Sequence, residues 1–218
     1  MTFRKKALYC CITTAFVLLL ACFLLIQRSL TEVDKSVMRL KSKGIDLIDG
    51  YEVPVWPVFH SNDNDWVAPN GYYDNWIAKY FCERGFTECF AHNKKLDRAD
   101  IVAISKLSHL NKLTFSCCSL PRDWAALLLP RCKRIKFLAI GQSTFNTNTL
   151  KSIPTLRHVT RIHFENLDFA NCFEELVLCL TSLSAHCLEE VYFGNCGLTE
   201  EQVAKLKKRV PDLNVECE

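Results

Sequence analysis

The sequence predicts an α/β fold: a solenoid with short parallel strands on its concave face and helices or turns on its convex face, behind an N-terminal transmembrane helix. Two observations predict it. A short pattern of apolar residues recurs four times between Leu110 and Leu198, and a stretch near the N-terminus carries no charge over twenty residues. With 49% hydrophobic and 23% charged residues in 218, the composition is that of a globular protein rather than a disordered one.

The recurring pattern is apolar, two residues, apolar, one residue, apolar, two residues, a small or apolar residue, one residue, apolar. Its second apolar positions follow one another at intervals of about 22–29 residues, a period typical of repeat units that each contain one strand and a return segment. One degenerate copy precedes the four full copies, and one truncated copy follows them. In order, the copies are Phe86, Cys89, Ala91, Lys94, Leu96; Leu110, Leu113, Phe115, Cys118, Leu120; Ile135, Leu138, Ile140, Ser143, Phe145; Val159, Ile162, Phe164, Leu167, Phe169; Leu188, Val191, Phe193, Cys196, Leu198; and Val210, Leu213, Val215.

These residues resemble the leucine-rich repeat family, with Cys118, Ser143, Leu167 and Cys196 at the family's asparagine or cysteine position. The match runs from Phe86 to Cys217, within a predicted repeat domain at 86–218. The wider layout is similar to membrane-anchored bacterial leucine-rich repeat proteins. The resemblance implies a curved array that binds partners through its concave face. Lys94 and Leu167 depart from the pattern, and the longest interval implies an insertion near residues 179–186.

Alternation within each copy predicts which side chains are free to bind a partner. Successive strand residues face opposite sides, so Leu113 and Phe115 are expected in the core and their neighbours outside. The outward residues in this register are Lys112, Thr114, Ser116, Phe137, Ala139, Gly141, Arg161, His163, Glu165, Glu190, Tyr192, Gly194, Asp212, Asn214 and Glu216.

Exposed aromatic residues are enriched at the centres of protein interfaces, and three of them fall in neighbouring outward rows. The predicted partner-binding residues are Phe137, His163 and Tyr192 at the centre, Arg161, Glu165 and Glu190 as a charged rim, and Thr114 beside them. The alternative is that Phe137 packs under a flanking loop.

The segments after the copies predict helices over Asp97–Leu107, Pro121–Leu129, Cys172–Leu183 and Thr199–Arg209, and a brief helical turn over Asn146–Ile153. The last of these helices opens with Thr199 and, three residues on, Gln202. This spacing is a capping box, in which each residue satisfies a backbone N–H of the other.

Residues 1–6 form a basic flank, and residues 7–26 are apolar over about 30 Å if helical, the thickness of the hydrocarbon layer of a bilayer. A retained anchor of signal-anchor type is the preferred interpretation. A cleaved signal peptide and a lipid attached at Cys22 are the alternatives. Basic residues on both sides of the span leave the positive-inside rule undecided. The Arg4, Lys5 and Lys6 cluster favours a single-pass protein with the bulk of the chain extracytoplasmic.

Residues 27–85 are predicted to connect the span to the repeats. Thr31–Lys43 has the apolar spacing of an amphipathic helix that stops at Gly44, and Ile45–Val55 alternates as a strand or, alternatively, forms a juxtamembrane stalk. Residues 54–73 are rich in proline and asparagine and indicate a loop. Asp74–Arg84 has helical spacing with Gly85 at its end.

No motif for catalysis is present: there is no Gly-x-Ser-x-Gly, no phosphate-binding glycine loop and no His-Glu-x-x-His. Close cysteine pairs with zinc-ligand spacing are absent as well, so no metal and no small-molecule cofactor is expected. Thirteen cysteines leave room for disulfides, with Cys82 and Cys89 or the group Cys172, Cys179 and Cys187 as candidates.

A net charge of +3 without a basic stripe indicates no nucleic-acid partner. The sequence therefore predicts a non-enzymatic, membrane-anchored module that binds an unknown protein partner, with the membrane contacted through residues 7–26. A structural protein of the envelope and a thiol-based redox protein are the alternatives.

Overall fold

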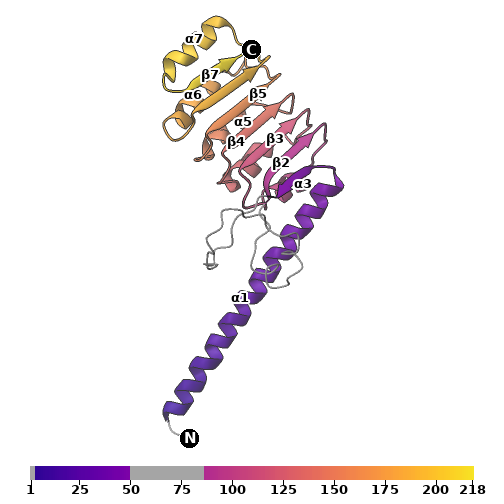
Figure 1. Cartoon of the computed structure of the whole chain (residues 1–218), viewed down its shortest axis with the longest axis vertical. Coiled ribbons are helices and arrows are strands. Elements are labelled where there is room, and N and C mark those ends of the chain that lie inside the picture. Colours follow the sequence, from indigo (N-terminus) through magenta and orange to yellow (C-terminus); the bar gives the residue numbers. More distant parts are fainter. Residues whose placement is uncertain (1–2, 50–85) are drawn as a thin grey trace, which may run out of the picture. The chain divides into compact units, whose positions relative to one another are not determined.

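The computed structural model describes residues 3–49 and 86–218 (Figure 1). The chain divides into two compact units, one made of Met1–Lys35 and Pro54–Glu83 and the other of Ser36–Val53 and Arg84–Glu218. The second unit contains the sheet. The predicted loop at 54–73, the predicted helix Asp74–Arg84 and the end of the predicted strand near Val55 lie outside the described residues.

The described residues form a seven-stranded sheet in which the spatial order of the strands is their order along the chain (Figure 1). Strands β2 to β7 run parallel to one another, and β1 pairs antiparallel with β2. The strands are β1 Asp46–Asp49, β2 Phe86–His92, β3 Lys112–Ser116, β4 Phe137–Gly141, β5 Arg161–Glu165, β6 Glu190–Gly194 and β7 Asn214–Cys217.

The predicted strand register is confirmed. Leu113 lies opposite Leu138, which lies opposite Ile162, and all three side chains are completely buried. The alternate positions are half-buried or exposed, with two exceptions. Gly141 and Gly194, expected on the outside, are buried, because the side chains of Glu165 and Tyr192 lie over them.

Helices follow the parallel strands at the predicted places. They are α3 Arg98–Ile104, α4 Trp124–Leu128, α5 Thr147–Ser152, α6 Phe173–Ser184 and α7 Glu200–Arg209, with 3-10 turns η2 Leu129–Arg131 and η3 Ile153–Thr155. The capping box of Thr199 and Gln202 is confirmed. A second capping box at α3 joins Asp97 to Asp100. Asn146 caps α5, which is the brief helix expected there.

The core lies between the helices and the side of the sheet that carries the apolar residues. The Phe115 ring of β3 meets the Trp124 ring of α4 edge to face, with centroids 5.1 Å apart, which places α4 on this side. The Trp124 indole N–H donates to the carbonyl of Thr144 at 3.1 Å, so this buried polar group is satisfied. Further along the sheet, Phe164 stacks on Phe193 with centroids 5.6 Å apart.

Each strand from β2 to β6 is followed by a residue with positive φ, between 44° and 54°. These residues are Asn93, Cys117, Gln142, Asn166 and Asn195. In each turn the backbone N–H donates to a carbonyl that closes or follows the neighbouring strand, as from Cys117 to Gly141 at 2.8 Å. The left-handed conformation turns the chain away from the strand that it has just formed. The apolar pattern of the sequence does not predict these positive φ values.

Helix α1 runs from Phe3 to Ser42, and Gly44 with φ +67° follows its end, as predicted. The prediction of a separate helix beginning at Thr31 is wrong, because no glycine or proline interrupts the sequence before it. In the unit with the sheet, the end of α1 is joined to α3. Arg39 Nε donates to Asp100 Oδ1 at 2.7 Å, and Lys43 Nζ lies 3.3 Å from Asp100 Oδ2.

The predicted transmembrane helix at residues 7–26 is contradicted. Among the residues that the structure describes, no helix is both long enough and apolar enough to cross a bilayer. The single-pass, extracytoplasmic location was inferred from that span, so this prediction is contradicted as well.

The fold-class prediction is also wrong as a whole. The structure is a mixed α/β fold with one seven-stranded sheet, and it does not indicate a solenoid. Two features explain the error. Strand β1, from outside the recurring pattern, joins the same sheet in the antiparallel direction, and the return helices range from five residues in α4 to twelve in α6. The local apolar pattern specifies strands and their buried sides but carries no information on either feature.

Candidate interaction surface

The side of β2–β7 opposite the helices carries the polar and aromatic outward residues, and we call it the open face. All seven predicted partner-binding residues lie on it. Lys112, Phe137, Arg161 and Glu190 form one row of paired positions across the strands, and Thr114, Ala139, His163 and Tyr192 form the next. Thr114 is separated from His163 by Ala139, whereas the other predicted residues are immediate neighbours.

The aromatic centre consists of Phe137, His163 and Tyr192. The His163 ring meets Phe137 edge to face, with centroids 4.7 Å apart, and lies 5.3 Å from the Tyr192 ring. Two cations flank the same phenylalanine: Lys112 Nζ lies 5.5 Å and the Arg161 guanidinium 5.8 Å from the Phe137 centroid. Among the described residues, the ring and the cations around this half-buried phenylalanine come from neighbouring strands. The placement of Phe137 under a flanking loop stays an alternative prediction.

Charged groups surround this centre and set its protonation states. His163 Nε2 lies 3.9 Å from Glu190 Oε1. Burial lowers the pKa of His163, an effect that Glu190 partly offsets and Arg161 reinforces. The Tyr192 hydroxyl donates to Glu218 Oε2 at 2.6 Å, and this hydrogen bond raises the pKa of Tyr192 to about 12. At neutral pH the centre is thus an uncharged imidazole beside a neutral phenol.

Residues from the first strands extend the surface beyond the predicted set. Phe90 of β2 pairs with Thr114, is 39% exposed and stacks on His92. Lys112 forms an ion pair with Glu88 at 3.1 Å. Alternation within the degenerate copy at Phe86–Leu96 also assigns Phe90 and His92 to this face, so the sequence contains the pattern that predicts them.

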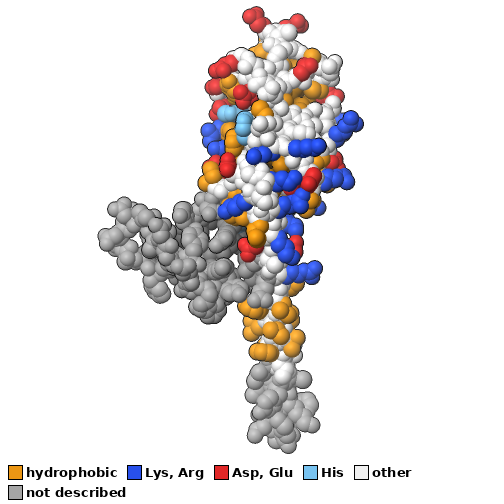
Figure 2. All heavy atoms as spheres, turned by 90° about the vertical axis from the view of Figure 1, so that its right-hand side faces the viewer, with side chains coloured by type: hydrophobic (Ala, Val, Ile, Leu, Met, Phe, Trp, Pro, Cys, Tyr) orange, Lys and Arg blue, Asp and Glu red, His pale blue; other side chains and the backbone are white. Residues whose placement is uncertain are grey.

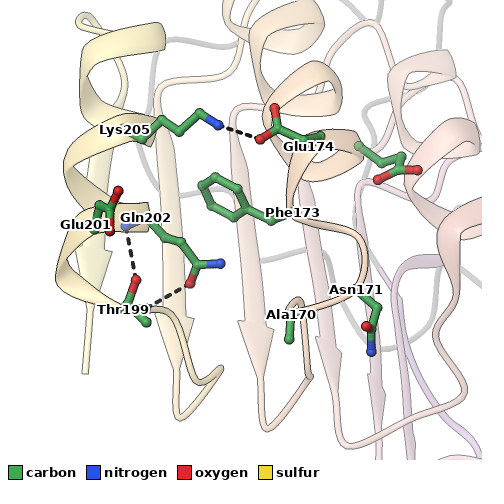
Figure 3. A pocket seen from close by; sticks show the side chains of 9 residues that line it. Ala170, Asn171, Phe173, Glu174, Thr199, Glu201, Gln202 and Lys205 are labelled. Atoms are coloured by element: carbon green, nitrogen blue, oxygen red, sulfur yellow. Dashed lines mark hydrogen bonds and ion pairs between the residues drawn. The ribbon is translucent and has the colours of Figure 1, made fainter.

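A shallow polar groove of about 500 Å³ lies on the helical side, where α6 meets α7 (Figure 3). Phe173 points toward α7, Lys205 forms an ion pair with Glu174, and Thr199 and Gln202 are bonded to each other as the cap. These groups already have partners within the groove, and none of its lining residues is a histidine or a cysteine. The groove offers no nucleophile with an adjacent base.

The cysteines that the structure describes are free thiols. The bridges considered among Cys172, Cys179 and Cys187 are therefore absent, and Cys82 lies outside the described residues. Burial raises the pKa of Cys89, Cys132 and Cys179 to about 12. Within the same ranges, no group of three or more histidines, cysteines or carboxylates is arranged to hold a metal ion.

The cysteines of the recurring pattern have a structural explanation. Cys118 and Cys196 are buried, and their thiols donate to carbonyl oxygens of Ala91 and Phe164, at 3.2 and 3.4 Å. A small side chain with a weak donor fits where the chain leaves the strand.

Comparison with protein-family models and with characterised proteins found no match. The resemblance to the leucine-rich repeat family stays a prediction.

Proposed function

We propose that this chain is a non-catalytic protein-interaction module that binds a protein partner through the open face, with Phe137, His163 and Tyr192 at the centre of the interface. The observation that carries the proposal is the aromatic centre itself. The ring of His163 contacts the rings of Phe137 and Tyr192 on the two neighbouring strands, on the side of the sheet that no helix of the described residues covers.

Two physical arguments support it. The rings lie on paired strands β4, β5 and β6 and pack against their neighbours, so they lose little side-chain freedom when a partner buries them. Tyrosine is among the residue types that dominate interface energies, and clusters of aromatic residues within a polar rim are the usual arrangement of such centres.

The rival functions have less support. A thiol-based redox protein needs an exposed cysteine of low pKa. Burial raises the pKa of Cys89, Cys132 and Cys179 to about 12, and the pKa of Cys217, which is exposed, is also raised. A structural protein should associate with itself. Sedimentation velocity of the purified full chain separates this case, because a binding module stays monomeric until its partner is added.

The direct test places a photo-crosslinking residue at Ala139, which lies between Thr114 and His163, in the full chain in the cells that produce it. The matched position is Leu178, which is 69% exposed on α6. We expect a defined protein adduct from position 139 and none of the same mass from position 178.

The adduct's protein is then purified and its affinity measured. The double variant Phe137→Ala, Tyr192→Ala is expected to weaken binding by about 2 kcal/mol or more, roughly thirtyfold, with folding nearly intact. The control Leu178→Ala removes an exposed apolar side chain from the helical side and should bind as the unaltered chain does. Normal binding by the double variant, together with loss on substitution of helical residues, would refute the proposal.

A further inference from the structure

The charges of the open face are unevenly distributed. Across β5–β7 and the residue after them it carries Glu165, Glu190, Glu216 and Glu218, against Arg161 as the one cation of these strands on this face. The whole chain is positive, with a net charge of +3, so this acidity is local. On the face that the space-filling view shows, acidic side chains gather at the upper end, where Figure 1 places the C-terminus, and basic ones lie below them (Figure 2).

These carboxylates are little neutralised from within. In the described part of the chain, Glu165, Glu216 and Glu218 form no ion pair with a lysine or arginine, in contrast to Glu88, which Lys112 neutralises. Glu190 has His163 as its neighbour, at 3.9 Å, and lies opposite Arg161 on the adjacent strand. Glu216 pairs with Tyr192, and Glu190 pairs with Asn214, so Glu190 and Glu216 are diagonal neighbours on β6 and β7. Like charges at diagonal positions, about 7–8 Å apart, repel one another weakly, and a positive charge from outside would relieve this repulsion.

Tyr192 lies among these carboxylates. A Cβ at Gly194 would lie 3.0 to 3.3 Å from Cε1, Cζ and the hydroxyl of Tyr192, so this edge of the ring reaches over the glycine. An aromatic ring surrounded by carboxylates binds ammonium or guanidinium groups, through the negative ring face and through charge.

We infer that the partner presents a basic segment, with a lysine or arginine over Tyr192 between Glu190 and Glu216 and an apolar side chain on Phe137. This inference rests on the proposed function and adds the chemistry of the partner. Charge complementarity selects this occupant: an acidic segment would meet Glu165, Glu190 and Glu216 unneutralised, and each unneutralised contact would oppose binding.

The probes are two fluorescent peptides of equal length, one alternating leucine with arginine and the other alternating leucine with glutamate. Fluorescence anisotropy with the full chain at near-physiological salt should show the arginine peptide binding at least about tenfold more tightly. The triple variant Glu165→Gln, Glu190→Gln, Glu216→Gln should lose about tenfold or more in affinity for it.

The matched control is Glu174→Gln, Glu175→Gln, Glu201→Gln. It removes the same charge from the groove on the helical side, which also contains an aromatic ring, Phe173. Binding within about twofold of the unaltered chain is expected. The open-face variant should melt close to the unaltered chain, because its substitutions keep the size of each side chain and lie outside the core. A loss of affinity with no loss of stability excludes misfolding as its cause.

Three outcomes overturn the inference: tighter binding of the glutamate peptide, a larger effect of the control variant, or a dimer of this chain that the open-face variant abolishes. The double variant Phe137→Ala, Tyr192→Ala distinguishes the two proposals. If it no longer binds the arginine peptide or the crosslinked partner protein, while the triple glutamine variant still binds both, the basic segment is refuted and the interaction surface stands. If neither variant affects the partner, the proposed function itself fails.

Discussion

Replacing Cys117 by asparagine should stabilise the fold. Cys117 has φ +54° in the turn after β3, and three of the four equivalent turns place asparagine at this position: Asn93, Asn166 and Asn195. A left-handed residue with an ordinary side chain costs about 1–2 kcal/mol, and asparagine reduces this cost because its short amide tolerates the conformation. The thiol offers little in return, since it donates to the amide oxygen of the exposed Gln142 at 3.3 Å.

The expected gain is therefore about 0.5–1 kcal/mol in the free energy of unfolding. Urea unfolding of the full chain measures it, with the fluorescence of the buried Trp124 as one contributing signal. The reciprocal variant Asn166→Cys should lose a similar amount, because it recreates the Cys117 situation two strands further on. If Cys117→Asn gains nothing and Asn166→Cys loses nothing, the positive φ carries no strain and the reasoning is wrong.

Three further results are expected. Leu138→Ala should cost about 2–5 kcal/mol in urea unfolding, because the side chain is fully buried in the central strand; a cost below about 1 kcal/mol would contradict the register. Glu190→Gln should lower the pKa of His163 further in an NMR titration, whereas Arg161→Gln should raise it. Since folding already lowers that pKa, His163 contributes stability above its ordinary value near 6.5 that is lost as the pH falls below it, and the reverse slope would refute this. Cys179 should resist alkylation in the native chain and react on unfolding, since burial raises its pKa to about 12; fast native reaction would restore the redox alternative.

The strands are predictable because each depends on residues close together in the chain. The pattern at Leu113 and Phe115 requires one side chain in the core at every second position, and this alone assigns Thr114 to the open face. The same alternation, applied to three successive copies of the pattern, places Phe137, His163 and Tyr192 on one face. The helix caps at Thr199 and Asn146 are equally local, since a cap is formed by neighbouring residues.

What the sequence does not reveal depends on how particular side chains and distant segments meet. Gly141 and Gly194 are buried because Glu165 from the next strand and Tyr192 from the same strand lie over them, and alternation cannot predict the direction of a long side chain. The antiparallel pairing of β1 with β2 joins segments about 40 residues apart, and the alternation of β1 fits a stalk as well as a strand.

The junction between α1 and α3 illustrates why such pairs matter for the proposed surface. Asp100 falls within a predicted helix, yet its carboxylate is completely buried and needs Arg39, 61 residues away. Burying a carboxylate without a partner destabilises the folded state. The Asp100 carboxylate therefore requires the cations at the end of α1 to lie beside α3. Asp97 meets the same arginine and also caps α3, and the N–H of Asp100 is the main cause of its lowered pKa. The first helix behind the sheet is thus held by charges that lie on the side away from the open face.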